Sequence, residues 1–292
     1  MAVRRSRVIL ITGCSSGFGL LSAARLAGEG HRVHACVRDL KKSQHLHVET
    51  ASRGGAKNLS VHAMDVADPV SIKAVVTEIA SREGVIDVLI NNAGFGIGGF
   101  FEDLSDEDWR RQFDTNFFGV LNVTREVLPV MRPRRAGRII NISSMAAFSG
   151  SPAFSAYASS KWALEGFSEC LYMELKPFHI DVILVEPGSY RTRIFTENAR
   201  YAANFNRKDS PYYAMSCQLK SFVDSYLRRS RRSPEEVAKV ISALATQEHT
   251  RFRNIIGLLS RLRCWVVRHI PFELYAWAVA RIFFRGTTKP HA

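Results

Sequence analysis

Three residues near the middle of the chain have the side chains and the spacing for proton transfer to a carbonyl group. Tyr157 and Lys161 are four residues apart in a stretch typical of a helix ending before Pro177, so phenol and ammonium lie on one face. Because a nearby cation favours the phenolate, we expect Lys161 to lower the pKa of Tyr157 from about 10. Ser144 ends a strand-like run, 137–143, where its hydroxyl could hydrogen-bond the carbonyl oxygen that Tyr157 protonates.

A Tyr-x-x-x-Lys spacing is common in helices and is weak evidence of catalysis by itself. The strands, turns and helices around it must therefore indicate whether it lies at a ligand site. At the amino terminus, an apolar strand (8–12) leads into a glycine-rich turn and a helical pattern that ends at Gly28 or Gly30. Such a turn lets a backbone approach a pyrophosphate, and the helix that follows offers free N–H groups and a positive dipole end. The residues of the turn that we expect to bind a dinucleotide are Gly13, Ser15, Ser16, Gly17, Phe18 and Gly19.

The second predicted strand, 32–37, ends at Arg38. An acidic residue at this place holds a ribose 2′-hydroxyl, whereas a basic one suits a 2′-phosphate. Arg38, with a hydroxyl from Ser16, therefore favours NADP as the cofactor. NAD stays open as the alternative, because Asp39 could pair with Arg38 or compete for the ribose.

Further strands and helices alternate as in a doubly wound sheet. One strand, 59–64, leads to Asp65 and Val66, where the carboxylate could accept from an adenine amino group. Another, 86–90, leads to the small residues Asn92, Ala93 and Gly94, which permit close approach to a ribose. The remaining predicted elements are helices from Pro69 to 82, from Ser105 with Asp108 as a capping pair, and from a capping box at Ser233–Glu236 to 245, and strands at 179–185 and 252–256.

In this order and at these intervals, the motifs resemble those of the short-chain dehydrogenase/reductase family over roughly residues 6–256. The motifs are Thr12-Gly13-x-x-x-Gly17-x-Gly19, Asn91-Asn92-Ala93-Gly94, Asn116, Ser144, Tyr157-x-x-x-Lys161 and Pro187-Gly188-x-x-x-Thr192. Within the family, the chain looks most similar to retinol and 17β-hydroxysteroid dehydrogenase-like members.

The resemblance implies a seven-stranded parallel sheet with helices on both faces and a catalytic tetrad of Asn116, Ser144, Tyr157 and Lys161. Tyr157 would be the acid in reduction and the base in oxidation, and Lys161 would lower its pKa and bind the nicotinamide ribose. Ser144 would polarise the carbonyl group, and Asn116 would hold a water that relays protons to Lys161. Pro187, Gly188 and Thr192 would contact the cofactor, with Thr192 on the carboxamide.

Length and composition predict one domain, 1–292, with a lid at about 193–232 and an amphipathic extension at 257–289. Five widely spaced cysteines indicate a reducing compartment, and the histidines lack metal-ligand spacing, so no metal is expected. The first apolar run is too short for a signal peptide, and no run spans a bilayer, which predicts a cytoplasmic protein.

Positive charge is concentrated in the last third, where residues 200–292 hold 17 Lys and Arg against 6 Asp and Glu. The extension divides at Pro271 into two helices with apolar faces. A membrane surface, a lid over the site and a homo-oligomer contact stay open as roles for it. The arginine run at 228–232 is typical of a solvated face, so no nucleic-acid partner is expected.

Apolar loops predict a lipophilic alcohol or ketone as substrate, such as a steroid or a retinoid. The loop residues concerned are Phe95, Ile97, Phe100, Phe101, Met145 to Phe148, Tyr190, Phe195, Tyr212 and Tyr213. Two alternatives remain. One is a 3-ketoacyl or 3-ketosphingoid substrate on an acidic carrier that meets Arg132, Arg134, Arg135 and Arg138, and the other is a cofactor-sensing module without turnover.

Overall fold

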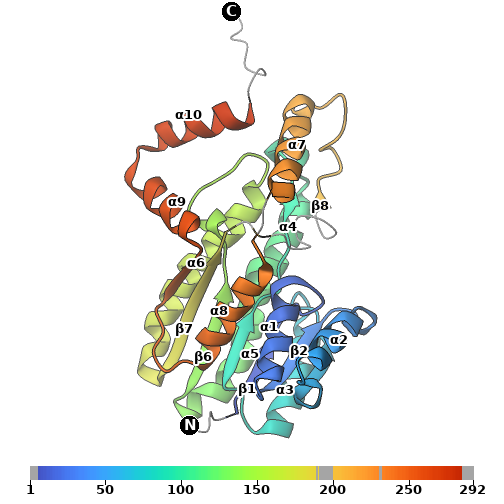
Figure 1. The fold of residues 1–292 in the computed structure, drawn as a ribbon, viewed down its shortest axis with the longest axis vertical. Coiled ribbons are helices and arrows are strands. Elements are labelled where there is room, and N and C mark those ends of the chain that lie inside the picture. The colour runs from blue at the N-terminus through green and yellow to red at the C-terminus, as the bar shows by residue number, and fades with distance from the viewer. Residues whose placement is uncertain (1–5, 189, 191–199, 230–231, 285–292) are drawn as a thin grey trace, which may run out of the picture.

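The computed structural model describes residues 6–188, 190, 200–229 and 232–284 (Figure 1). Its centre is a seven-stranded, wholly parallel sheet in the order β3-β2-β1-β4-β6-β7-β9. The strands are β1 (Val8–Ile11), β2 (Arg32–Val37), β3 (Leu59–Ala63), β4 (Val88–Asn91), β6 (Gly137–Ile142), β7 (Ile180–Pro187) and β9 (Arg253–Ile256). The predicted doubly wound sheet is therefore confirmed. The strand order reverses between β1 and β4, where folds of this kind bind ligands at the carboxyl ends.

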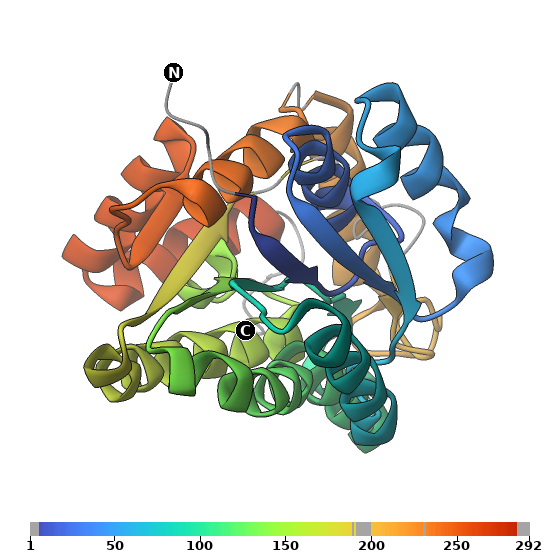
Figure 2. The same ribbon diagram turned by 90° about the horizontal axis from the view of Figure 1, so that it is seen from below.

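Helices cover both faces of the sheet, which Figure 2 shows edge-on between two layers. The layer over one face holds α1 (Gly17–Gly28), α2 (Gln44–Ser52) and α8 (Pro234–Thr246), and the other holds α3 (Pro69–Glu83), α5 (Gly119–Met131) and α6 (Ser155–Leu175). Side chains of β1 alternate between the two cores: Ile9 packs into one and Leu10 into the other. Burial on both faces explains why the strands read as continuous apolar runs.

A π-helical segment, Asp114–Phe118, separates α4 (Asp106–Phe113) from α5. The predicted cap before it is confirmed, because Ser105 and Asp108 form a reciprocal capping box. Insertion of one residue into a helical turn changes the direction of its side chains and is frequent at functional sites. Asn116 lies in this segment and is fully buried.

The cap expected at α8 is only partly present. Ser233 accepts from the N–H of Glu235. The Glu236 carboxylate instead accepts a hydrogen bond of 3.0 Å from the Tyr190 hydroxyl, so this acid ties α8 to the chain after β7.

Part of the expected lid is regular structure rather than an irregular loop. A two-stranded sheet joins β5 (Ile97–Gly98) to β8 (Arg200–Tyr201), and α7 (Tyr213–Arg229) follows. The sequence was expected to be irregular here, and α7 was not predicted. Met215, Leu219 and Val223 nevertheless recur at helical spacing and pack into the same hydrophobic core. The predictions for 193–199, including Phe195, concern residues outside the described part of the chain.

The extension forms α9 (Leu258–His269) and α10 (Phe272–Phe283), as the break at Pro271 predicts. Figure 1 shows both helices beyond the carboxyl ends of the strands, at the end of the molecule away from the amino terminus. Within the described part of the chain, no helix is long and apolar enough to cross a membrane.

The arginines considered for binding an acidic carrier lie at the amino ends of the strands, opposite the end where the proposed catalytic residues lie. Arg138 is at the start of β6, whereas the proposed catalytic residues follow its end. Its guanidinium is buried and donates to the carbonyl oxygens of Leu244 and Gln247 at 2.6 Å and to Asp181 at 2.7 Å. These contacts make Arg138 a structural residue, and Arg134 likewise pairs with Asp87.

Replacing Arg138 by Leu should lower the free energy of unfolding by about 2–4 kcal/mol, because buried carbonyl groups lose a charged donor. Arg134→Leu is the matched control: its ion pair is partly exposed, so the loss should stay below about 1 kcal/mol. Urea unfolding of both variants measures the difference. Equal losses would contradict the structural role assigned to Arg138.

Candidate active site

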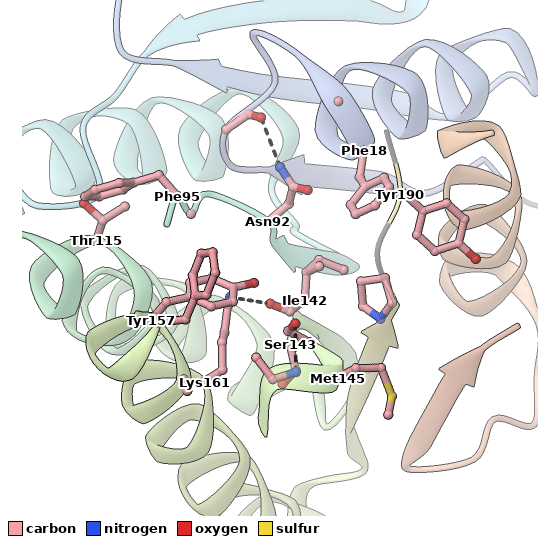
Figure 3. A pocket seen from close by; sticks show the side chains of 18 of the residues that line it. Phe18, Asn92, Phe95, Thr115, Ile142, Ser143, Met145, Tyr157, Lys161 and Tyr190 are labelled. Carbon is pink, nitrogen blue, oxygen red and sulfur yellow. Dashed lines mark hydrogen bonds between the residues drawn. The ribbon is translucent and has the colours of Figure 1, made fainter. Parts of the chain in front are cut away.

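A cavity of about 930 Å³ opens at the carboxyl ends of the central strands (Figure 3). It brings together most residues that the sequence analysis singled out. Those lining it are Gly13, Ser15, Ser16, Gly17, Phe18, Arg38, Asp65, Val66, Asn92, Ala93, Gly94, Ser144, Tyr157, Lys161, Pro187 and Gly188. Gly19 and Asn116 lie behind this wall, and Thr192 is outside the described residues.

Lys161 reaches from α6 to the end of β6, beside Tyr157 (Figure 3). Its ammonium donates a hydrogen bond of 2.8 Å to the carbonyl oxygen of Ile142. Burial lowers the pKa of Lys161 to about 8, and the charge of Glu165 opposes this shift. The side chain is thus fixed in place, and its pKa lies nearer to neutral pH than that of an ordinary lysine.

Tyr157 differs from the expectation in its titration. Burial raises its pKa above the ordinary value, and the side-chain hydrogen bond with Ser144 opposes the rise. The ammonium of Lys161 is directed to Ile142, so it does not lower the pKa of Tyr157 as expected. In this arrangement Tyr157 is a phenol, the form that donates a proton.

Three hydrogen bonds hold the Asn116 side chain in place. Its amide nitrogen donates to the Phe95 carbonyl oxygen at 2.9 Å and to the Ser160 hydroxyl at 3.2 Å. Its carbonyl oxygen accepts from the Phe95 N–H at 3.1 Å. Both N–H groups of the Asn116 side-chain amide are used, so a water bound by Asn116 would have to donate to an oxygen atom of that residue.

Gly94 lies between Asn116 and Lys161. A β-carbon added there would be 3.3 Å from the Asn116 side-chain oxygen and 3.7 Å from the Lys161 nitrogen. A glycine at this position therefore leaves the space between the two polar groups open to a ligand.

The turn before α1 has the shape of a phosphate cradle. Gly13 and Gly17 have φ values of +70° and +60°, which favour glycine. A β-carbon at Gly13 would come within 2.7 Å of Ala93, and one at Gly19 would overlap Asn92. The N-cap residue Ser16 makes no side-chain capping hydrogen bond to α1, and the first turn of the helix holds no acidic residue. These features fit a dinucleotide pyrophosphate.

Asn92 braces this turn from the neighbouring strand. Its amide nitrogen donates to the carbonyl oxygens of Thr12 at 2.8 Å and of Gly13 at 3.0 Å. The Thr12 hydroxyl in turn accepts from the N–H groups of Asn92 and Ala93. The glycine turn and the residues after β4 therefore form one rigid unit.

Beyond β2, two basic residues and one acid line the cavity. Arg38 and Lys42 are exposed cations. Asp39 caps the 3₁₀ turn Leu40–Ser43 by accepting from the N–H of Lys41 at 3.0 Å. The sequence did not predict that Lys42 lines the cavity, although this residue is only four positions after Arg38. The 3₁₀ turn places it there, and the turn was not predicted.

Behind α6, Arg253 joins three carboxylates, those of Glu165, Glu169 and Glu186. Burial and the neighbouring Glu165 raise the pKa of Glu186 to about 8, although Arg253 acts against this. The cluster connects β9 and β7 to the helix that carries Lys161. It therefore fixes the position of that helix against the end of the sheet.

The far wall of the cavity comes from α7, α9 and α10, which the sequence analysis did not assign to it by residue. Its members are Leu219, Phe222, Val223, Arg263, Tyr275, Val279, Ile282 and Phe283. Among the expected rim residues, Phe95, Met145 and Tyr190 line the cavity, whereas Phe101 is 70% exposed and packs on Trp109 instead.

Comparison with known proteins places this site in a family. A model described as short chain dehydrogenase matches residues 7–202. The uncharacterized oxidoreductase YusZ of Bacillus subtilis is 42% identical over 83% of this chain and 86% of its own. A 3-ketodihydrosphingosine reductase of Bacteroides thetaiotaomicron is 36% identical over 95% and 98% of the two chains. Retinol dehydrogenase 8 of Bos taurus is 36% identical over 86% and 84%.

Solved structures agree with the fold. A short-chain dehydrogenase from Streptomyces avermitilis superposes with a TM-score of 0.79 and 30% identity, covering 98% of this chain and all of the other. A metagenomic short-chain oxidoreductase in complex with NADP has a TM-score of 0.68 and 28% identity, covering 87% and 98%.

Tyr157→Phe should reduce turnover by about 10²–10⁴-fold, because it removes the proton donor and keeps the ring. Cofactor affinity, followed by fluorescence titration, should change little. Tyr190→Phe is the matched control: it changes another tyrosine of the same cavity, whose hydroxyl contacts Glu236. Near wild-type turnover in Tyr157→Phe would remove Tyr157 from the mechanism.

Proposed function

Since the chain belongs to the short-chain dehydrogenase family and is an NAD(P)-dependent oxidoreductase, we propose that it uses NADP to interconvert a lipophilic alcohol and its carbonyl compound. The substrate would be a secondary alcohol or ketone, for example a steroid, or a retinoid-like alcohol or aldehyde. The non-catalytic alternative is set aside, because the chain belongs to a class of enzymes.

The apolar half of the cavity carries the proposal on substrate. From the hydroxyl groups of Ser144 and Tyr157, the wall continues as aliphatic and aromatic side chains toward α7 and α10. These are Met145, Phe154, Leu219, Phe222, Val223, Val279, Ile282 and Phe283. Such a lining stabilises a long apolar skeleton by removing it from water, and it offers few partners to a sugar or a hydroxy acid.

The chain's own residues hold the reacting oxygen and move its proton. A bound nicotinamide supplies or accepts the hydride. In reduction, Tyr157 donates its phenolic proton to the carbonyl oxygen, and Ser144 donates a hydrogen bond to the same oxygen. Lys161 donates to the Ile142 carbonyl oxygen and so holds the helix that carries Tyr157 against the end of β6.

The preference for NADP rests on charge beyond β2. Arg38 and Lys42 present two cations to the cavity, which suits the 2′-phosphate. The carboxylate of Asp39 is engaged in capping a turn, which reduces its ability to accept from a ribose hydroxyl.

A second candidate substrate is a 3-ketosphingoid or 3-ketoacyl chain. It is favoured by the relative named a 3-ketodihydrosphingosine reductase, because that similarity covers nearly the whole of both chains. An acidic carrier that binds Arg134 or Arg138 is not part of the proposal, since these residues lie away from the cavity. A free or membrane-bound fatty ketone would use the same apolar wall.

A panel of carbonyl compounds with NADPH distinguishes the candidates. We expect oxidation of the cofactor with retinal, steroid ketones or 3-ketosphinganine, and much less with short polar ketones. Absorbance at the reduced nicotinamide band follows the reaction, and chromatography identifies the alcohol. Preference for a sugar or a short hydroxy acid would contradict the proposed substrate class.

Arg38→Leu should weaken NADPH binding by about 10–100-fold, because one charge-assisted contact contributes about 1.5–3 kcal/mol. NADH binding should change little, and Lys42→Leu should act in the same direction. Arg32→Leu is the control, since Arg32 is a basic residue at the start of the same strand and pairs with Glu83. A wild-type preference for NADH would instead assign the choice to Asp39.

A further inference from the structure

The two last helices carry a concentration of exposed apolar side chains. Of the sixteen large hydrophobic residues exposed in the described part of the chain, eight lie in α9 and α10, so they form a patch rather than scattered positions. Seven of them form what we call the outer face: Leu258, Leu259, Leu262, Trp265, Phe272, Leu274 and Trp277, with exposed fractions from 52% to 79%. The eighth, Ile282, also lines the main cavity.

Helix α9 separates a packed side from this outer face. Ser260 and Cys264, one turn apart, are its buried residues. At 3.6 residues per turn, Leu258, Leu262 and Trp265 fall on the opposite side. The part of the chain that the structure describes therefore leaves the apolar side of α9 exposed.

Arginines border the outer face of α9 on both flanks. Arg263 lies on one flank and donates to the Ser149 hydroxyl at 2.8 Å. Arg261 and Arg268 lie on the other, where Arg261 donates to the Ile255 carbonyl oxygen at 3.1 Å. All three remain exposed, so their charges are available to an anionic surface.

Helix α10 has a similar division. Tyr275, Val279 and Phe283 face the cavity of the site, while Trp277 faces outward with the Arg281 guanidinium 4.5 Å from its ring centre. No residue of α10 is fully buried. The helix is held by its cavity side, through the Tyr275 hydroxyl on the Gly150 carbonyl oxygen and the Phe283 ring on Phe222.

We propose that α9 and α10 dock the protein on an anionic lipid surface. Residues 257–284 hold four arginines and one glutamate, so the apolar face has a basic border. Each helix has twelve residues, about 18 Å in length, which suits a helix lying in the interface and not one that crosses the bilayer. Tryptophan and arginine beside aliphatic side chains are typical of that position.

A second copy of the chain fits this surface less well than a lipid does. Two copies packed through their outer faces would bring like-charged arginine borders together, which opposes association. Anionic headgroups satisfy the same arginines, and the acyl region takes up the leucines and tryptophans. Self-association is therefore an outcome that the test must separate from lipid binding.

Docking would also give an apolar substrate a direct route, an extension that rests on the proposed function. A second cavity of about 670 Å³ lies between α10 and the start of α6. It shares Ser151, Ala158, Tyr275 and Val279 with the main cavity. Phe272 of the outer face lines it too, so this second cavity borders both the outer face and the main cavity.

Flotation of the full chain with vesicles tests the docking, without substrate or cofactor. The wild type should float with vesicles of phosphatidylcholine and phosphatidylglycerol, and less with phosphatidylcholine alone or at high salt. The triple variant L258E/L262E/W277E should bind at least about tenfold more weakly. The control V48E/V70E/M173E adds the same three charges at exposed apolar positions elsewhere and should bind like the wild type.

A second measurement needs no disruptive variant. Brominated lipids should quench the tryptophan fluorescence of the wild type, and the conservative variant W265F/W277F should lose most of that quenching. Wild type that stays in the aqueous fraction at low salt, or that loses binding equally in both triple variants, overturns the proposal. A dimer that L258E/L262E/W277E dissociates, without lipid binding, would assign the face to a second copy. Turnover in solution remains an independent test of the proposed function.

Discussion

The site depends on one buried ammonium. Lys161 has little exposure and needs an acceptor, which the Ile142 carbonyl oxygen at the end of β6 provides. That requirement fixes α6 against the sheet and thereby places Tyr157 beside Ser144. The Arg253 cluster behind α6 and the π-helical segment that carries Asn116 support the same position from two sides. Helices thus hold Asn116, Tyr157 and Lys161, and Ser144 caps the short turn directly after β6.

The cavity joins two environments with different chemistry. Its inner half is polar, with a glycine turn clamped by Asn92 and two cations beyond β2. Its outer half is apolar and is closed by helices that expose further apolar surface on their other side. A protein that binds a charged cofactor and a lipophilic substrate needs both halves to meet at Tyr157. The last helices connect that meeting point to the surface of the molecule.

Much of this could be predicted from the sequence because the signals are local. Strands buried on both faces are continuous apolar runs, and the glycine turn, Ser144 and the Tyr157–Lys161 pair depend on short spacings. The direction of the Tyr157 pKa shift could not be predicted, since burial raises this pKa and the Lys161 ammonium is directed to the Ile142 carbonyl oxygen. The positions of the Asp39 and Lys42 side chains depend on a short 3₁₀ turn. Polar residues within α7 obscure its helical periodicity in the sequence. Arg138 is a basic residue that only the fold reveals to be buried.

The central claim is that this cavity transfers a hydride to a lipophilic carbonyl carbon while Tyr157 protonates the oxygen. Reaction with NADPH deuterated at the transferred position, followed by mass spectrometry of the alcohol, tests it directly. The account predicts one deuterium on the carbinol carbon per turnover, with solvent deuterium entering only the hydroxyl group. An alcohol without cofactor-derived deuterium at that carbon, or cofactor oxidation without alcohol, would contradict it.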